Sequence, residues 1–162
     1  MLIRRMMRDD LEQAAAIELE CFGREAWSVQ AFADALNNPA ALYLCAQEEA
    51  AAETSFDAAG SPSLCGSICG ICGIWQSFEE GEIMNVAVLP SHRGRGTASA
   101  LLARLFEEAG RMGVLDFTLE VRESNLPAIR LYESAGFAVE GVRRNFYDHP
   151  RENALIMWKR HG

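Results

Sequence analysis

A short stretch rich in glycine and arginine stands between an apolar run and a helical pattern, and it reads Arg93-Gly94-Arg95-Gly96. Glycine lets the backbone come close to a ligand, and the N-terminus of a helix binds anions, so the stretch predicts a phosphate site. It lacks the Lys followed by Ser or Thr of a Walker loop and the three glycines of a dinucleotide fingerprint. A plain glycine turn with solvated arginines is the alternative that the stretch alone leaves open.

One carboxylate stands inside a strand-like pattern. In the run "LEVR", alternation places Leu119 and Val121 on one face and Glu120 on the other. A carboxylate in a central strand costs free energy unless it has a partner or a function. Partial burial would raise its pKa, as a general base requires. A salt bridge to Arg122 or Arg130 is the alternative interpretation of Glu120.

A tyrosine and an asparagine share one face of the next helical pattern. Tyr132 follows Asn125 by seven residues, which is about two turns of an α-helix. A phenol in a cleft can donate a proton, although tyrosine at this spacing is more often part of a core. The spacing alone leaves both interpretations open.

Three of the five cysteines, Cys65, Cys69 and Cys72, have a C-x3-C-x2-C spacing that can hold an iron–sulfur cluster. They alternate with Gly and Ile and run into a strand-like segment, which favours small buried strand residues instead. An odd number of cysteines argues against a disulfide framework. His92 and His149 have no partner ligands at a suitable spacing, so we predict no metal site.

Length and composition are typical of a single globular domain covering residues 1–162. The formal net charge of −8 disfavours general nucleic-acid binding and favours a basic substrate only non-specifically. No apolar run approaches the ~20 residues that span a bilayer, and the first residues carry charges where a signal peptide is apolar. We therefore expect a cytoplasmic protein without a membrane partner, as a monomer or a weak dimer.

The hydrophobic pattern that must position these residues predicts a mixed α/β domain, in the order strand, two helices, three strands, helix, strand, helix, two strands. The predicted strands span residues 2–6, 41–48, 64–78, 81–89, 114–122, 138–147 and 152–159. The predicted helices span residues 9–22, 26–38, 97–113 and 124–137. In the first helix, the pair Asp9-Asp10 is the expected cap, and Leu11, Ala15, Leu19 and Phe22 share one face.

The segment "NVAVLPSHRGRGTASALL" resembles the acetyl-CoA-binding core of the Gcn5-related N-acetyltransferases, the GNAT superfamily. The family loop Q/R-x-x-G-x-G/A matches the six residues from Arg93 to Ala98, and the predicted element order matches along nearly the whole chain. The resemblance implies a mostly antiparallel central sheet with helices on both faces, whose fourth and fifth strands splay apart around the thioester. The cofactor-binding residues that it implies are Val86, Ala87, Val88, Arg93, Gly94, Arg95, Gly96, Thr97, Ala98, Ser99, Asn125 and Tyr132.

A narrower resemblance, to the RimI branch of that family, rests on "LEVRESNLPAIRLYESAGF", "RRNFY", "ENALIMW" and "WSVQAF". RimI-type enzymes are ribosomal-protein-alanine N-acetyltransferases, which acetylate the N-terminal alanine of a small-subunit ribosomal protein. Two departures bear on the substrate: Glu25-Ala26 stands where His-Pro is common, and the loop Glu48–Ser63 is longer than expected. Both are expected near the place where a peptide docks.

The resemblance also implies a role for each candidate residue. Glu120 would take the proton of the amine, and Tyr132 would protonate the leaving sulfur, with direct attack in a ternary complex. Loop amides would hold the pyrophosphate, while Asn125 and the backbone of Val86 and Val88 would bind the pantetheine arm. The N–H of Val88 or a neighbour would stabilise the oxyanion. No cysteine is expected in the gap, which disfavours a covalent enzyme intermediate.

Trp27, Arg144 and Tyr147 are weaker candidates for contacts with the peptide, and a core tryptophan and surface strand residues are the alternatives. Two other functions remain open: acetylation of a small amine or a lysine side chain, and CoA binding without turnover. The presence of both Glu120 and Tyr132 argues against a module without turnover.

Overall fold

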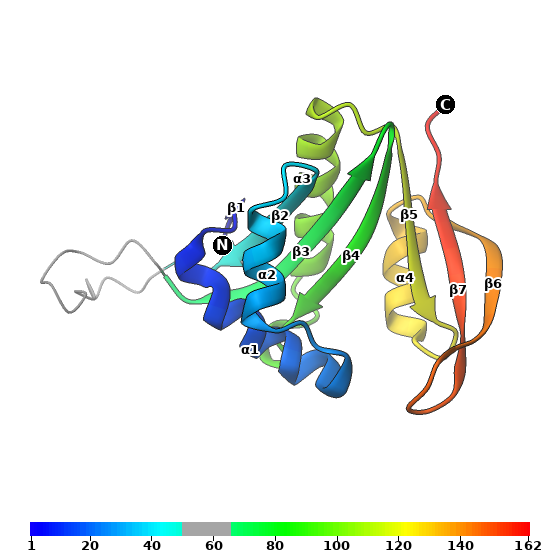
Figure 1. The fold of residues 1–162 in the computed structure, drawn as a ribbon, viewed down its shortest axis with the longest axis horizontal. Coiled ribbons are helices and arrows are strands. Elements are labelled where there is room, and N and C mark those ends of the chain that lie inside the picture. The colour runs from blue at the N-terminus through cyan, green and yellow to red at the C-terminus, as the bar shows by residue number, and fades with distance from the viewer. Residues whose placement is uncertain (50–65) are drawn as a thin grey trace, which may run out of the picture.

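The computed structural model describes residues 1–49 and 66–162, and within them the chain forms one seven-stranded sheet (Figure 1). The strand order is β1-β2-β3-β4-β5-β7-β6, and every neighbouring pair is antiparallel except β4 and β5. The strands are β1 (Leu2–Arg5), β2 (Ala41–Gln47), β3 (Ile68–Ser77), β4 (Glu80–Val88), β5 (Asp116–Arg122), β6 (Ala138–Tyr147) and β7 (Glu152–Lys159). The predicted element order and the mixed α/β fold class are confirmed.

The sheet is divided in its middle because β4 and β5 pair over a short stretch. Their parallel register joins only Glu80–Glu82 of β4 to Asp116–Thr118 of β5. Beyond it, β5 continues to pair with β7 as far as Arg122, whereas β4 bulges between Ile83 and Asn85 and pairs with β3. The two strands diverge, so a gap opens between the β1–β4 part and the β5–β7 part (Figure 1). The splay that the resemblance implied is present.

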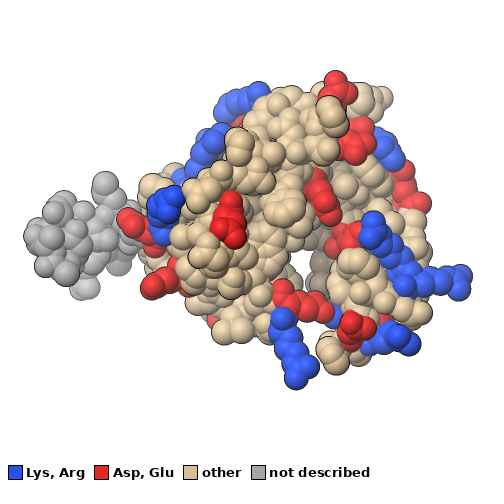
Figure 2. Space-filling model, viewed as in Figure 1, with Lys and Arg blue, Asp and Glu red and all other residues tan. Residues whose placement is uncertain are grey.

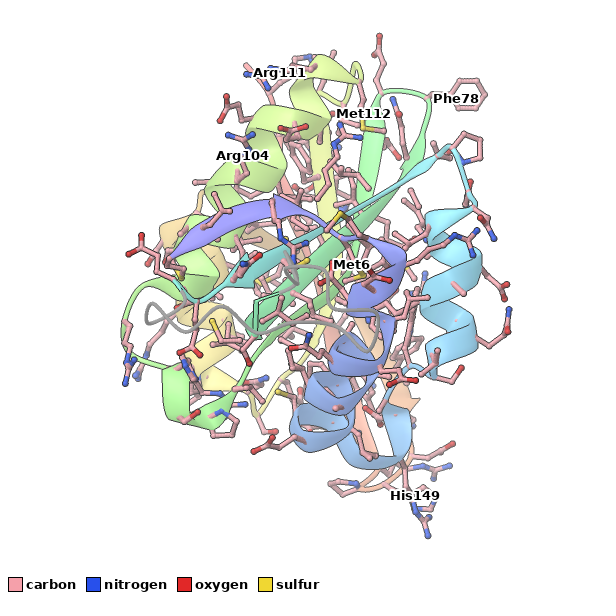
Figure 3. All side chains as sticks on the ribbon, turned by 90° about the vertical axis from the view of Figure 1, so that its left-hand side faces the viewer. Met6, Phe78, Arg104, Arg111, Met112 and His149 are labelled. Carbon is pink, nitrogen blue, oxygen red and sulfur yellow. The ribbon has the colours of Figure 1, made fainter. Side chains whose placement is uncertain are left out.

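Helices cover both faces of the sheet. They are α1 (Leu11–Phe22), α2 (Val29–Leu36), α3 (Thr97–Arg111) and α4 (Leu126–Ser134). The buried cluster under α1 and α2 contains Ile17 and Phe32, and the cluster under α3 contains Leu101 and Leu105. Figure 3 shows the sheet between these layers, with Arg104 on the outward side of α3.

The first helix packs against the sheet by a different face from the one predicted. Leu11 is buried together with Ala14, Ile17 and Glu18, whereas Leu19 is 63% exposed. The run is rich in alanine, which fits either a buried or an exposed face, so the local pattern does not fix the helix rotation. The carboxylate of Glu18 therefore lies inside the fold.

Asp10 precedes α1 but does not cap it with its side chain. Its carboxylate is fully buried, accepts the backbone N–H of Met7 at 2.7 Å and is paired with both terminal guanidinium nitrogens of Arg4 at 2.7 and 2.9 Å. Asp10 therefore joins β1 to the segment before α1 rather than capping the helix.

Cys69 and Cys72 are buried on β3, which confirms their interpretation as small strand residues. Their thiols lie 3.5 Å from the carbonyl oxygen of Ala46 and 3.7 Å from that of Leu101. Cys65 lies outside the described residues. In the described ranges, no group of three or more His, Cys, Asp or Glu side chains is placed to hold a metal ion. The same ranges contain no helix that is long and apolar enough to cross a membrane.

Candidate active site

A cleft of about 510 Å³ lies in the gap between β4 and α4, with the C-terminal end of α1 on one side. Its wall contains all of the predicted cofactor residues except Arg95, which is exposed outside it. The predicted residues that line it are Val86, Ala87, Val88, Arg93, Gly94, Gly96, Thr97, Ala98, Ser99, Asn125 and Tyr132. Residues from β4, the glycine loop and α4 are thus brought together by the fold. We name this site the cofactor cleft.

The glycine loop is a backbone anion site. Gly94 and Gly96 have φ angles of 74° and 78°, in the left-handed region that side chains disfavour. Space is not the reason for these glycines, since a Cβ at either position would meet no atom within 4 Å. Gly96 is the N-cap of the fifteen-residue helix α3 and gives it no side-chain cap. The N–H groups of the first turn therefore remain available to an anion in the cleft.

The edge of β4 offers further donors to the cofactor cleft. The N–H of Leu89 donates to the carbonyl of Cys69 on β3 at 2.8 Å, so these residues form a hydrogen-bonded pair of the antiparallel ladder. Hydrogen-bonded and non-hydrogen-bonded pairs alternate, so the N–H groups of Val86 and Val88 point away from β3 into the gap. The carbonyl of Val88 also points away, because it accepts from Nε of Arg93 at 3.0 Å. That bond ties the Nε of Arg93 to β4, although Arg93 and Arg95 are both exposed, as in the alternative interpretation.

Glu120 lies on the α1 and α2 face of β5, opposite the buried Leu119 and Val121, as predicted. Its side chain is 21% exposed, and its Oε1 lies 3.0 Å from Nε of Arg143 on β6. Burial raises the pKa of Glu120, the Arg143 charge partly offsets the rise, and the Glu82 carboxylate adds to it. The raised pKa is as predicted.

The predicted salt-bridge partners of Glu120, Arg122 or Arg130, are wrong. Arg122 is committed elsewhere, to Glu25 at 2.5 Å and to Glu152 at 3.3 Å. Arg130 is exposed on α4. The actual partner, Arg143, comes from the edge strand β6, two strands away in the sheet.

Tyr132 and Asn125 share one face of α4 and both line the cofactor cleft, as their spacing predicted. Tyr132 is only 8% exposed, and its ring packs edge-on against Phe137. Burial raises the pKa of its hydroxyl well above the usual range, so the group keeps its proton at neutral pH. Asn125 caps α4, and its Oδ1 accepts the N–H of Ala128 at 3.3 Å, which leaves the amide Nδ2 for a ligand.

A second cleft, of about 770 Å³, opens between the segment after α1 and the β6–β7 hairpin. We name it the peptide-side cleft. Tyr147 lines it with its ring 4.2 Å below the guanidinium of Arg122, and burial and the Glu120 charge raise the pKa of its hydroxyl to about 12. Glu25 lines it as well, so the departure from His-Pro places an acidic group in this wall. His149 also lines it, at the tip of the hairpin in Figure 3.

The other two candidates for peptide contacts lie outside both clefts. Trp27 is in the core under α2, where its ring lies within 6.2 Å of the rings of Phe32, Tyr43 and Trp75. The core-tryptophan alternative is therefore correct. Arg144 is an exposed residue of β6 and lines neither cleft.

A cysteine lies where none was expected. Cys21, at the end of α1, lines both clefts, and its thiol donates to the carbonyl of Val88 at 3.4 Å. The expectation of a gap without a cysteine is therefore wrong. Burial raises the pKa of the Cys21 thiol, which keeps it protonated, so its chemistry gives no support to a thiolate nucleophile.

A buried polar chain behind the strand edge also escaped prediction. Tyr43 donates to Oδ1 of Asn85 at 2.7 Å, and Nδ2 of Asn85 donates to Oε1 of Glu18 at 2.8 Å. Glu18 is 2% exposed, burial raises its pKa, and its Oε2 has no partner among the described residues. The chain fixes Asn85, which directly follows the β4 bulge. A polar residue in a strand of apolar neighbours was the available signal.

The loop Glu48–Ser63 lies almost entirely outside the described residues. Its described beginning, Glu48, pairs with His92, and His92 lines the cofactor cleft. The backbone N–H of Glu48 also donates to the carbonyl of Ser67 at 3.0 Å. The described residue Glu48 thus contacts the wall of the cofactor cleft, while the expectation that the loop lies near the peptide falls on residues outside the described ranges.

Comparison with known proteins agrees with this geometry. Residues 11–137 match the model of the acetyltransferase (GNAT) family. A Bacillus subtilis protein, provisionally named a [ribosomal protein bS18]-alanine N-acetyltransferase, is 31% identical over 157 residues, which cover 96% of this chain and 93% of that protein.

Solved structures of N-acetyltransferases share the fold of this chain. The crystal structure of the ribosomal-protein-S18-alanine N-acetyltransferase from Escherichia coli matches with a TM-score of 0.78 and 30% identity, over 98% of this chain and 92% of that one. A GNAT family acetyltransferase from Elizabethkingia anophelis, with acetyl-CoA bound, has the same fold with a TM-score of 0.70 and 15% identity, over 98% of this chain and 97% of that one.

Proposed function

This chain belongs to the GNAT family of acetyltransferases, and we propose that it transfers an acetyl group from acetyl-CoA to the N-terminal alanine of a small-subunit ribosomal protein. The observation that carries the proposal is the meeting of the two clefts at the gap, where Cys21, Phe22 and Asn125 line both. Tyr132 lines the cofactor cleft, and Glu120 lines neither cleft but shares a face of β5 with Arg122, which lines the peptide-side cleft. The names of the two ribosomal-protein-alanine relatives support the substrate.

The cofactor cleft fits acetyl-CoA by the chemistry of its donors. The first-turn amides of α3 would hold the pyrophosphate, and the unpaired N–H groups of Val86 and Val88 would hold the amide-containing pantetheine arm. The Nδ2 of Asn125 faces the same arm from α4. Bound acetyl-CoA supplies an activated acetyl thioester, and the residues of this chain would orient the substrates and move the protons.

The amine must lose a proton before it attacks, because an α-amino group has a pKa of about 7.7–8.0 and is mostly ammonium at neutral pH. Glu120 accepts that proton, directly or through a water, and its raised pKa brings it nearer to that of the amine. The N–H of Val88 or a neighbour stabilises the negative charge on the carbonyl oxygen. Tyr132, which is still protonated at this pH, donates to the leaving sulfur.

The peptide enters from the other side of the gap. Tyr147, Arg122 and Glu25 form the wall that a peptide backbone would follow on its way to Glu120. Figure 2 shows this face of the molecule, where a hollow bordered by charged side chains separates the two parts of the sheet. A ribosomal-protein substrate would place the reaction in the cytoplasm. The expectations of a monomer or weak dimer and of no nucleic-acid partner stay predictions from the sequence.

The proposal is tested by incubating the protein and acetyl-CoA with a mixture of peptides and finding the acetylated atoms by mass spectrometry. The mixture contains basic peptides that begin with Ala, Ser or Met, and N-terminally blocked peptides that contain lysine. We expect acetylation of the α-amine of the peptides that begin with Ala.

Two other outcomes contradict the proposed substrate in different ways. Acetylation of blocked peptides at lysine would keep the chemistry of the cleft and move the substrate to a side-chain amine. No acetylation, together with retained CoA binding in a calorimetric titration, would favour a small-amine substrate or a module without turnover.

A further inference from the structure

Glu120 of β5 and Arg143 of β6 lie two strands apart on one face of the sheet. The register across β5, β7 and β6 places Glu120 opposite Ile156 and Ile156 opposite Gly141, and it places Ala154 opposite Arg143. Residues directly opposite each other project from the same face, so Glu120 and Arg143 share the face that carries the peptide-side cleft. On β7, Ile156 stands between Glu120 and Gly141, whereas the residue opposite Arg143 is the small Ala154.

The ion pair between Arg143 and Glu120 involves only one of the two carboxylate oxygens. Nε of Arg143 lies 3.0 Å from Oε1 of Glu120, and within the described ranges no donor bonds to Oε2. The Arg143 side chain is 57% exposed and that of Glu120 is 21% exposed, so the pair is partly open to solvent, although neither residue lines the cofactor cleft or the peptide-side cleft. A carboxylate held by one oxygen keeps the lone pairs of the other for a proton.

We propose that Arg143 is a positioning residue of the acid–base site, which holds Glu120 by Oε1 and directs Oε2 at the amine of the substrate. The inference rests on the proposed role of Glu120 as the base and adds the residue that orients it. Without Arg143, the partly exposed Glu120 side chain would rotate among its rotamers, and fewer of them would face the amine.

The other charged and titratable groups around Glu120 do not replace Arg143. Glu82 of β4, opposite Thr118 in the parallel register, is a like charge that raises the pKa of Glu120. Tyr147 is neutral at physiological pH, since its pKa is about 12. Arg122, on the same face of β5, is paired with two other carboxylates. Arg143 is therefore the cation in ion-pair contact with Glu120 among the described residues.

The first test is a nuclear magnetic resonance titration of the full chain labelled with carbon-13 at the glutamate carboxyl groups. The Glu120 signal is identified by its absence in Glu120→Gln. Arg143→Ala should raise the pKa of Glu120 by about half a unit, the size expected for a partly exposed ion pair. Arg160→Ala is the matched control, because Arg160 pairs with Glu140 of β6 at 2.8 Å and lines neither cleft. An unchanged pKa in Arg143→Ala overturns the proposal.

The second test is steady-state kinetics with acetyl-CoA and an unacetylated peptide that begins with Ala and carries a free α-amine. Arg143→Ala should lower kcat by about fivefold with the KM for acetyl-CoA unchanged, and Arg143→Lys should restore part of the loss. A shifted pKa with wild-type kcat would show an electrostatic neighbour without a positioning role and would also overturn the proposal. Circular dichroism of each variant confirms that it is folded. The titration needs no turnover, so it stands even where the proposed substrate fails.

Discussion

The two clefts that meet at the gap are built from different material. The cofactor cleft presents mostly main chain, namely the first-turn amides of α3 and the inward N–H groups of Val86 and Val88. The peptide-side cleft presents side chains held by one another, with Arg122 between Glu25 and Glu152 and above Tyr147. Main-chain donors survive most substitutions, whereas a wall of paired side chains changes with each of them. The cofactor cleft thus depends on backbone conformation, as at Gly94 and Gly96, and the peptide-side cleft depends on the identity of its paired side chains.

The largest effect is expected at Glu120, on the face of β5 that it shares with Arg122 of the peptide-side cleft. Glu120→Gln keeps the shape of the side chain and removes its basicity, so turnover should fall by about 10²-fold or more, as for a positioned base. CoA affinity should be unchanged, because Glu120 does not line the cofactor cleft. Peptide acetylation rates and calorimetric CoA titrations measure the two quantities. Glu133→Gln, the same change on the exposed side of α4, is the control, and wild-type turnover in Glu120→Gln would remove the base assignment.

The pH dependence separates the groups on the two sides of the gap. Glu120 must be ionised to accept a proton, and burial raises its pKa, so kcat should fall about tenfold per pH unit below a midpoint higher than the ordinary ~4.3 of glutamate. Tyr132 must be protonated, and its pKa is raised, so kcat should not fall between pH 8 and 9. Initial rates in saturating substrates give the profile. An acid limb at or below the ordinary value would contradict the assignment.

A substitution in the cofactor cleft should change the affinity for acetyl-CoA and leave the KM for the peptide unchanged. Gly96→Ala adds a Cβ where φ is 78°, which costs about 1–2 kcal/mol in the left-handed conformation or moves the loop amides. The Kd for acetyl-CoA should rise about tenfold, with the KM for the peptide unchanged. Gly110→Ala is the control, because Gly110 lies within helix α3 and its added Cβ meets no atom. That variant should bind normally and unfold at a slightly higher temperature.

A substitution in the peptide-side cleft should change the KM for the peptide alone, and by a smaller factor. Glu25→Gln removes a 46% exposed acidic group from the wall, so the KM should rise about threefold for peptides whose second residue is basic. The KM for acetyl-CoA should stay the same. Glu12→Gln, in the exposed first turn of α1, is the control. Equal effects of Glu25→Gln on basic and acidic peptides would show that this wall does not select charge.

Local sequence patterns were sufficient to predict the fold and the residues of the cofactor cleft. Alternation of apolar residues defines the strands, and glycines before a helical pattern mark a turn that needs positive φ, as at Gly94 and Gly96. The face on which Glu120 lies follows from the two-residue period of a strand. Each of these properties depends on residues that are close together in the chain.

Pairings between distant segments could not be predicted in the same way. The partner of Glu120 is set by the register of β5, β7 and β6, so Arg143 was missed in favour of the nearer Arg122 and Arg130. Cys21 reaches the gap because α1 is rotated to bury Glu18, a rotation that an alanine-rich helix leaves open. Such contacts depend on how elements pack rather than on the pattern within any one of them.

The divergence of β4 from β5 also matters for solubility. A strand with unpaired N–H and C=O groups is a template on which other chains assemble, and proteins protect such edges at the sheet rim with charges or short strands. Here an unpaired edge is placed in the interior of the sheet, between the end of α1 and α4. A strand from another chain could pair with this stretch of β4 only if it entered the gap, which α1 and α4 flank. The narrow, flexible, amide-bearing arm of acetyl-CoA would need no such movement, so under the proposed function this edge would be shielded from other strands and still open to the cofactor.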